Sequence, residues 1–192
     1  MTDITSGITI ETITSLDRLK AAAPALKTLA ESVDAQFFQT PTFFIPWCEA
    51  ALKRKQVPHF LAAWDANQHM IGFVPLCRRR DPKSLFATRL APPRIGTSPP
   101  FDVLLASDID RKILIDEIVR VLEGQRWLDI ALSDALEGSL FNTLLAPALK
   151  QSGLNVTRSE GRKYLQVGAF ETVDGYLSQF KSKNRNLSLI HI

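Results

Sequence analysis

The chain has 192 residues, of which 45% are hydrophobic and 22% are charged, the balance of a globular protein that can bury a core. The formal net charge of +3 comes from a few short stretches that are not interleaved with aromatic residues, so nucleic acid is not an expected partner. There is no apolar run of the roughly 18 residues that a membrane span needs, no secretory signal, and too few cysteines for a disulfide framework, so we expect a cytoplasmic protein.

The first part of the sequence predicts one strand followed by helices. Ile8–Ile13 alternates apolar and polar residues, which is the period of a half-buried strand. Ser15 is suited to cap a short helix, Pro24 to begin a second helical segment, and Thr40-Pro41 to begin a third, because proline fits the first turn of a helix. Pro46 lies inside the third segment and is expected to kink it or delay its start.

The middle of the sequence predicts strands around an irregular loop. His59–Asp65 and His69–Arg79 are rich in aromatic and aliphatic residues and flank a turn signal, so a β-hairpin is expected. The basic run Arg78–Arg80 leads into Asp81-Pro82, which is typical of a strand that ends in a solvated turn. Leu90–Pro100 contains four prolines and a glycine, so we expect an irregular loop there.

The following segment alternates strands with helices. Phe101–Leu105 is expected to be a strand, and Asp108 is expected to open a helix that ends near Gly124. One side of this helix carries the apolar residues Ile115, Ile118, Val119 and Leu122, which should face the core. Trp127–Leu132 is then expected to be a strand, and Ser139–Gln151 a helix that Gly153 closes and Pro147 bends.

The end of the sequence predicts a last strand pair, Asn155–Arg158 with Lys163–Val167, and a final helix capped by Thr172. Strands interleaved with helices exclude an all-β sandwich and a helical bundle. The sequence therefore predicts a mixed α/β fold.

This order of elements resembles the acyltransferase fold of the GNAT superfamily, in which helices flank a mixed sheet. In that superfamily, a helix N-terminus after the fourth strand binds the pyrophosphate of acetyl-CoA through free backbone N–H groups, and glycines allow its close approach. The equivalent turn here, Leu105–Asp110, contains no glycine, and its two aspartates would repel a pyrophosphate. We therefore expect no cofactor-binding residues in this chain.

A narrower resemblance is to the two-domain acetyltransferases of the cellulose-biosynthesis (CelD/BcsL) type, which are related in build to the FemAB-like ligases. It rests on Phe38-Gln39-Thr40-Pro41, Trp47, Ile71–Leu76, Ile95-Gly96 leading to Phe101-Asp102, and the tail Tyr176–Asn186. Proteins of this type begin with a GNAT-like half that lacks a working cofactor loop, and a second half carries that loop.

The resemblance implies an acyltransferase that moves an acetyl or other acyl group from acyl-CoA to an amine or hydroxyl. The acceptor would be a small molecule or a saccharide, for example a polysaccharide or cell-envelope precursor. Acetyl-CoA would be the co-substrate of the intact protein and is not expected to bind this part of it. The alternative is a non-catalytic binding or scaffold module, because a fold does not fix a function.

The same resemblance divides the chain into a GNAT-like domain over residues 1–170 and the start of a helix over residues 171–186, which leads into a second GNAT domain. The last six residues, 187–192, can be encoded by the end sequence of a common sequencing-library transposon, so we expect this tail to be non-native. A natural apolar tail on the last helix is the alternative. The chain is thus expected to be inactive without its second half, the C-terminal part of the same protein.

No catalytic constellation is apparent, so the catalytic residues stay unknown and no metal site is expected. His59, His69 and His191 lack metal-ligand spacing, and the first two are expected to be exposed beside the hairpin turn. Cys48 and Cys77 are expected to be small buried hydrophobic residues. The chain contains no P-loop and no Gly-x-Gly-x-x-Gly motif.

The candidate substrate-binding residues are Trp47, Arg94 and Asp102. Arg94 and Asp102 bracket a long loop of the kind that often carries function. Asp102 is placed either to accept a proton from the amine or hydroxyl being acylated, or to cap the turn through its own backbone. Trp47 either lines a substrate groove or belongs to the core.

Overall fold

The computed structural model describes residues 7–80, 88–95, 99–125, 129–132 and 135–156. These residues belong to one structural unit, Met1–Gly161. Several predicted features lie wholly or partly outside the described residues. They are the turn at Asp81-Pro82, the first part of the strand Trp127–Leu132, the strand pair at 155–158 and 163–167, the helix from Thr172 with the tail Tyr176–Asn186, the domain boundaries at 170 and 186, and the tail 187–192 with His191.

The first helix, α1 (Leu16–Ser32), begins where the sequence predicts, because the Ser15 side-chain oxygen accepts a hydrogen bond of 3.1 Å from the backbone N–H of Arg18. The expected second start at Pro24 is wrong, since α1 continues through this residue. Pro24 is exposed, so its missing N–H falls on the solvent side of the helix. The opposite side is held by buried leucines, which are Leu19, Leu26 and Leu29.

The second helix, α2 (Pro41–Leu52), follows the short 3-10 helix η1 (Phe37–Gln39) and begins at Thr40-Pro41 as predicted. Pro46 does not delay its start. Like Pro24, it is an exposed proline inside a helix whose other side is buried. Both prolines show that packing of an apolar face can outweigh one lost backbone hydrogen bond.

The strands within the described residues form two four-stranded sheets, with orders β1-β3-β4-β7 and β2-β5-β6-β8. All neighbouring strands are antiparallel except β6 and β8, which are parallel. The strands are β1 (Thr9–Ile13), β2 (Val57–Pro58), β3 (Phe60–Trp64), β4 (Met70–Val74), β5 (Cys77–Arg80), β6 (Thr88–Ala91), β7 (Leu104–Leu105) and β8 (Asp129–Ile130).

The predicted hairpin is present, but its second strand is not one strand. The segment expected at His69–Arg79 divides into β4 and β5, which belong to different sheets. The two sheets are nevertheless joined by one register, because Leu61 of β3 pairs with Val74 and Pro58 of β2 pairs with Cys77, three residues further on each side. The segments β2–β3 and β4–β5 are therefore the two arms of a single long hairpin that is interrupted near Pro75.

The next strand is interrupted by a much longer stretch. Ala91 of β6 pairs with Cys77, and Leu104 of β7 pairs with Phe73, so residues 92–103 lie opposite residues 74–76. The loop expected at Leu90–Pro100 thus begins only at Pro92, and the strand expected from Phe101 is limited to β7. We call residues 92–103 the insertion; of these, 92–95 and 99–103 are described.

Helix α3 (Arg111–Glu123) is capped by Asp110, two residues later than the predicted start at Asp108, and it ends at Gly124 as predicted. All four predicted core residues of α3 are buried. The last described helix begins with a π-helical segment, η2 (Phe141–Leu145), and continues as α4 (Ala146–Gln151). The wider turns of η2 lie directly before Pro147, where distortion was expected.

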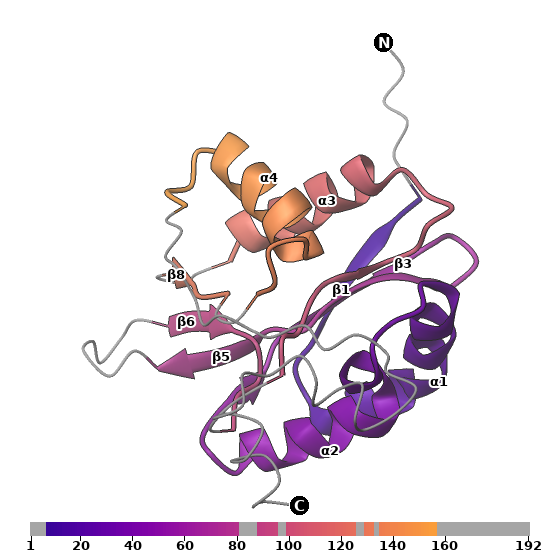
Figure 1. Ribbon diagram of the computed structural model, residues 1–192, viewed down its shortest axis with the longest axis vertical. Helices are drawn as coiled ribbons and strands as arrows, with labels where there is room; N and C mark the ends of the chain where they lie inside the picture. Colours follow the sequence, from indigo (N-terminus) through magenta and orange to yellow (C-terminus); the bar gives the residue numbers. More distant parts are fainter. Residues whose placement is uncertain (1–6, 81–87, 96–98, 126–128, 133–134, 157–192) are drawn as a thin grey trace, which may run out of the picture. The chain divides into compact units, whose positions relative to one another are not determined.

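Figure 1 shows α1 and α2 on one side of the strands and α3 and α4 on the other. The centre of the α2 side is Phe44, whose ring centroid lies 5.3 Å from that of Phe60 and 5.4 Å from that of Phe101. Buried residues of both sides and of both sheets form one continuous core. The predicted mixed α/β fold, with helices flanking the strands, is confirmed.

Candidate functional site

The insertion is fastened to α2 and its neighbours by side chains from distant parts of the sequence. Trp47 of α2 donates from Nε1 to the carbonyl oxygen of Pro93 at 3.0 Å. Gln39 of η1 donates from Nε2 to the carbonyl oxygen of Asp102 at 3.4 Å. These contacts place the two ends of the insertion beside α2.

A buried glutamine holds the part of the insertion that carries Arg94. The Gln56 side chain donates to the Arg94 carbonyl oxygen at 2.6 Å and accepts from the Arg94 backbone N–H at 3.0 Å. This amide therefore pairs with Arg94 much as a neighbouring strand would. Sequence reasoning missed Gln56, because a single glutamine before a strand gives no signal that it will be buried.

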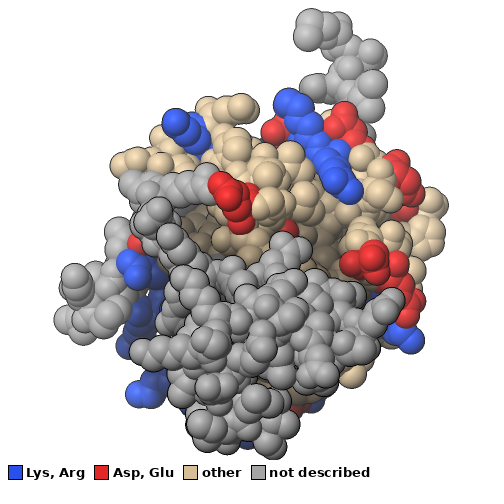
Figure 2. Space-filling view, viewed as in Figure 1, with Lys and Arg blue, Asp and Glu red and all other residues tan. Residues whose placement is uncertain are grey.

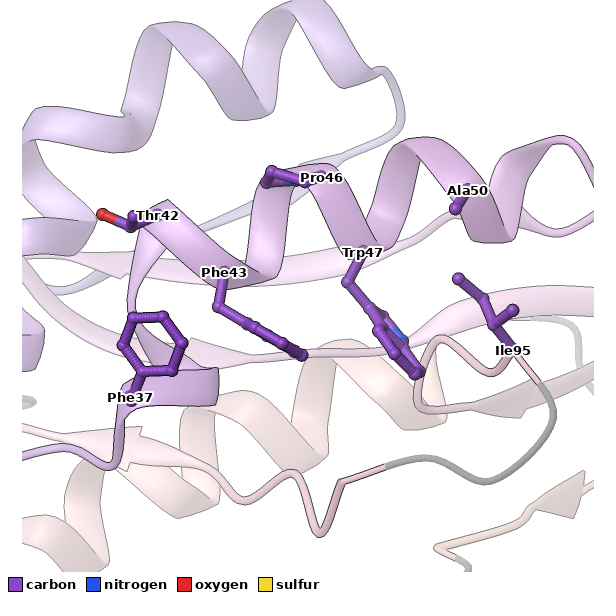
Figure 3. Close-up of a pocket in the computed structure, with 7 residues that line it drawn as sticks. All are labelled: Phe37, Thr42, Phe43, Pro46, Trp47, Ala50 and Ile95. Atoms are coloured by element: carbon purple, nitrogen blue, oxygen red, sulfur yellow. The ribbon is translucent and has the colours of Figure 1, made fainter. Parts of the chain in front are cut away.

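An aromatic groove runs along α2 and is closed at one end by the insertion (Figure 3). It has a volume of about 280 Å³ and is lined by Phe37, Thr42, Phe43, Pro46, Trp47, Ala50 and Ile95. The rings of Phe43 and Trp47 stack with centroids 5.5 Å apart and planes 21° apart. Phe37 keeps 66% of its surface exposed, so the groove opens to solvent and can accept an apolar group.

Trp47 lies between the core and the aromatic groove. Its ring stacks on Phe43 along the groove and also meets the edge of Phe101, with centroids 6.3 Å apart. Trp47 is therefore half-buried, packed against the core on one side and lining the groove on the other.

Asp102 points away from the groove. Its Oδ1 accepts from the backbone N–H groups of Val103 and Phe141, each at 2.8 Å, and its Oδ2 accepts from the N–H of Leu140 at 2.7 Å. Burial raises the pKa of this carboxyl above its ordinary value, and the three N–H groups oppose the shift. The carboxylate thus caps the start of η2, and it also accepts the backbone N–H of Val103, the next residue in the chain.

The structure therefore brings Trp47 together with the backbone around Arg94 and turns the Asp102 carboxylate toward η2. Asp102 remains linked to the site through its carbonyl oxygen, which accepts from Gln39. A carboxylate whose two oxygens already accept three hydrogen bonds is poorly placed to take a proton from a substrate.

The N-terminus of α3 is the position where the resemblance would place a pyrophosphate. Here Asp110 Oδ1 accepts from the backbone N–H of Lys112 at 2.9 Å and of Ile113 at 3.4 Å. The donors that would attract an anion are thus taken by a carboxylate of the same chain.

The structure contradicts the expected exposure of His59. This residue is buried, and its Nε2 forms a hydrogen bond of 2.5 Å with Gln125 Oε1, at the end of α3. Its Nδ1 is enclosed and has no partner among the described residues. The prediction failed because the turn begins at Asp65, well beyond His59, which lies between β2 and β3. His69 is exposed as predicted, with Nδ1 3.2 Å from Asp65 Oδ2.

Both cysteines are buried, as predicted. Burial raises the pKa of the Cys48 thiol, and it raises the pKa of the Cys77 thiol to about 12. These thiols are therefore protonated and unreactive at neutral pH. Within the described ranges, no group of three or more His, Cys, Asp or Glu side chains could hold a metal ion. None of the helices described has the length and apolar character to cross a membrane.

Comparison with known proteins gives similarity in structure alone. No family model and no curated protein matches the chain. A possible acetyltransferase from Clostridium difficile 630 has a TM-score of 0.46 at 11% identity, covering 84% of this chain and 99% of that chain. A GNAT family acetyltransferase from Staphylococcus aureus has a TM-score of 0.44 at 10% identity, covering 83% and 99%.

An aminoglycoside antibiotic 6'-N-acetyltransferase from Acinetobacter baumannii has a TM-score of 0.45 at 14% identity, covering 84% of this chain and 100% of that chain. Values this low identify neither the reaction nor the substrate of the present chain. The structure shows a mixed α/β protein with an inserted loop and an aromatic groove beside this loop.

Proposed function

We propose that the chain is the N-terminal half of a GNAT-type acyltransferase, of the two-domain cellulose-biosynthesis type. The intact protein would transfer an acetyl or other acyl group from acyl-CoA to an amine or hydroxyl of a small molecule or saccharide. One observation carries the proposal. Three residues on which the sequence resemblance rests, Gln39, Trp47 and Asp102, lie far apart in the chain and are drawn together around the insertion.

In this proposal, the groove and the insertion support the acyl acceptor. The acceptor amine or hydroxyl attacks the thioester carbonyl, the CoA thiolate leaves, and a general base takes the acceptor's proton while backbone donors stabilise the oxyanion. The aromatic wall of Phe43 and Trp47 would hold the apolar face of the acceptor.

The binding of acyl-CoA is assigned to the second half. The Asp110 carboxylate at the N-terminus of α3 would repel the pyrophosphate and already occupies the backbone donors that would bind it. We therefore propose that the 192-residue chain does not transfer acyl groups by itself.

A non-catalytic binding module is the second candidate. It is favoured by the position of the Asp102 carboxylate, which accepts three backbone N–H groups and is turned away from the groove. In that case, the groove would bind a ligand without changing it.

The test compares this chain with the product of the intact gene, read past the codon for Asn186. Each protein is incubated with radiolabelled acetyl-CoA and a panel of amines and saccharides, and the label in the acceptor fraction is counted. We expect transfer by the longer protein and none by the chain. Transfer by the chain would disprove its assigned inactivity, and a longer protein that neither binds acetyl-CoA nor transfers the label would favour the binding module.

A further inference from the structure

The outer side of α2 is apolar over most of its length. The groove residues Phe43, Trp47 and Ala50 follow one another at helical spacing on this side (Figure 3). The opposite side of α2 is apolar as well, because Phe44 and Cys48 are buried in the core. A helix that is apolar all round is usually enclosed all round. The outer side of α2 is therefore a surface that suits contact with a further apolar body.

Phe37 extends this surface into the solvent. Its ring meets the ring of Phe43 edge to face, with centroids 5.6 Å apart, and it is mostly exposed. Only Thr42 and Trp47 among the seven lining residues carry a polar side-chain atom, and the Trp47 indole N–H already donates to the Pro93 carbonyl. The groove thus offers few hydrogen bonds to a polar ligand, and its chemistry favours an apolar phase.

Three consecutive cations stand at the end of the same helix. Lys53, Arg54 and Lys55 are all exposed. The helical turn continues through the first two, since Lys53 has α-helical backbone angles and the Arg54 N–H donates to the Ala51 carbonyl at 2.9 Å. Positions three and four residues apart lie on one side of a helix, so Lys53 and Arg54 continue the side that carries Ala50.

These three cations are not neutralised by ion pairs within the described part of the chain. The acidic residue of α2, Glu49, lies one turn before Lys53 and is bonded to Lys20 at 2.6 Å. Figure 2 shows Lys and Arg side chains gathered at the left edge of the molecule, with few Asp or Glu side chains among them, and in Figure 1 the chain leaves α2 on this side. The apolar side of α2 therefore ends in a positive surface.

We propose that this side of α2 docks on a membrane surface that contains anionic phospholipid. The Phe37 ring and the groove enter the boundary between headgroups and acyl chains, and Lys53, Arg54 and Lys55 bind the lipid phosphates. An exposed apolar side next to cations is the chemistry of a helix that lies on a membrane rather than crossing it. The exposed aliphatic residue Val57, just beyond the cations, adds to the apolar part of this surface.

A nucleic acid fits this surface less well. Its backbone needs cations distributed along the bound strand, whereas the cations here are confined to one end of an apolar side. The inference goes beyond the proposed acyl transfer and does not depend on it. Both use the groove, and they agree where the acyl acceptor is itself a component of the membrane.

The test is co-sedimentation of the 192-residue chain with lipid vesicles. Vesicles of phosphatidylcholine alone are compared with vesicles that also contain phosphatidylglycerol, at low and at high salt. We expect binding to the anionic vesicles, and we expect it to weaken as salt rises, because salt screens the attraction between the charges. Absent binding to the anionic vesicles, or equal binding to both kinds, would overturn the proposal.

A double variant tests the cations. Lys53→Gln with Arg54→Gln should weaken binding to the anionic vesicles about tenfold or more. The matched control is Arg111→Gln with Lys150→Gln, which removes two exposed cations from α3 and α4, on the other side of the strands (Figure 1). This control should change binding less than about twofold. Equal losses in the two double variants would indicate a general attraction of a positive protein and would overturn the assigned surface.

Phe37→Ser tests the apolar part. Because Phe37 is mostly exposed, the variant should fold normally, and it should weaken vesicle binding about threefold or more. Ile113→Ser is the control, since Ile113 is an exposed apolar residue of α3, and it should leave binding unchanged. Thermal melts check that every variant folds. An unchanged affinity in Phe37→Ser would contradict insertion of the ring.

Two further measurements identify other occupants of this side of α2. A dimer in sedimentation velocity that Phe37→Ser dissociates would assign it to a second copy of the chain. A single-stranded oligonucleotide that displaces the vesicles and is weakened by the same cation variants would assign it to nucleic acid. Either result would overturn the proposal. Vesicle binding is measured without an acyl donor, so it can fail while acyl transfer by the longer protein is observed, and the reverse.

Discussion

His59 joins three elements at the boundary between the two sheets. Its backbone N–H donates to the Leu76 carbonyl at 3.1 Å, and its ring bonds Gln125, whose Nε2 lies 3.4 Å from Thr12 Oγ1. The ring is buried, and this burial is the main cause that lowers its pKa; Arg78 lowers the pKa further, and the bond to Gln125 opposes the shift. The folded protein therefore favours the neutral ring.

We predict that His59 makes stability depend on pH. In the unfolded chain a histidine has a pKa of about 6.5. Because the folded pKa is lower, the stabilising effect is complete above about pH 6.5 and is lost as the pH falls through that value toward the folded pKa. Urea midpoints measured between pH 5 and pH 8 should decline on the acid side, and His59→Gln should make this decline smaller.

The exposed histidine provides the control for this measurement. His69→Gln should leave the acid-side decline in place, because His69 lies in the solvated turn. If His59→Gln leaves the decline unchanged, the titration of His59 does not contribute to it.

At the scale of elements, Asp102 connects the end of the insertion with the start of η2. Replacing it by alanine leaves three backbone N–H groups without their acceptor, those of Val103, Leu140 and Phe141. Loss of a capping side chain typically costs about 1 kcal/mol, and buried unsatisfied donors add to it. We predict that Asp102→Ala lowers the free energy of unfolding by about 2–3 kcal/mol in urea titrations.

Two further variants distinguish capping from a general effect of lost charge. Asp102→Asn keeps one acceptor oxygen and should cost less than Asp102→Ala. Asp110→Ala removes the exposed cap of α3 and should cost about 1 kcal/mol. A loss in Asp102→Ala no greater than that in Asp110→Ala would contradict the assigned capping role.

The elements also show what local sequence can predict. Ser15, Thr40 and Gly124 mark helix ends through local hydrogen bonds or backbone shape, and the predicted ends agree with the structure. Pro24 and Pro46 were misleading, because whether a proline faces solvent depends on how the helix packs. The split between β4 and β5 could not be predicted, since it depends on where two other strands begin and end.

In the candidate site, too, the features that are local in sequence could be predicted and those that depend on distant segments could not. The long proline-rich loop and Trp47 were recognisable from sequence, because composition and aromatic spacing are local properties. The side chains that hold the loop in position, above all Gln56, come from segments far away in the chain. Asp102 was a candidate because of its place at the end of the loop, but the direction of its carboxylate depends on η2, which begins almost forty residues later.

At the scale of the whole described unit, the two sheets should open together. The pairing of β3 with β4 and of β2 with β5 keeps one register, and His59 bridges the two with its N–H bond to Leu76. Both sheets also contribute to one continuous core. Because the strands share a hairpin and a core, opening either sheet alone would break the shared pairing and expose the shared core, so we expect them to open together.

Native-state hydrogen exchange tests this prediction at the level of single amides. The slowest amides of Phe60–Trp64 and of Cys77–Arg80 should report the same opening free energy and the same dependence on low urea concentrations. The insertion supplies the internal comparison. The amide of Arg94 bonds a side chain rather than a strand, so it should exchange through a smaller opening with a weaker urea dependence. If Cys77–Arg80 instead exchanged like Arg94, the second sheet would be an independent and weaker unit.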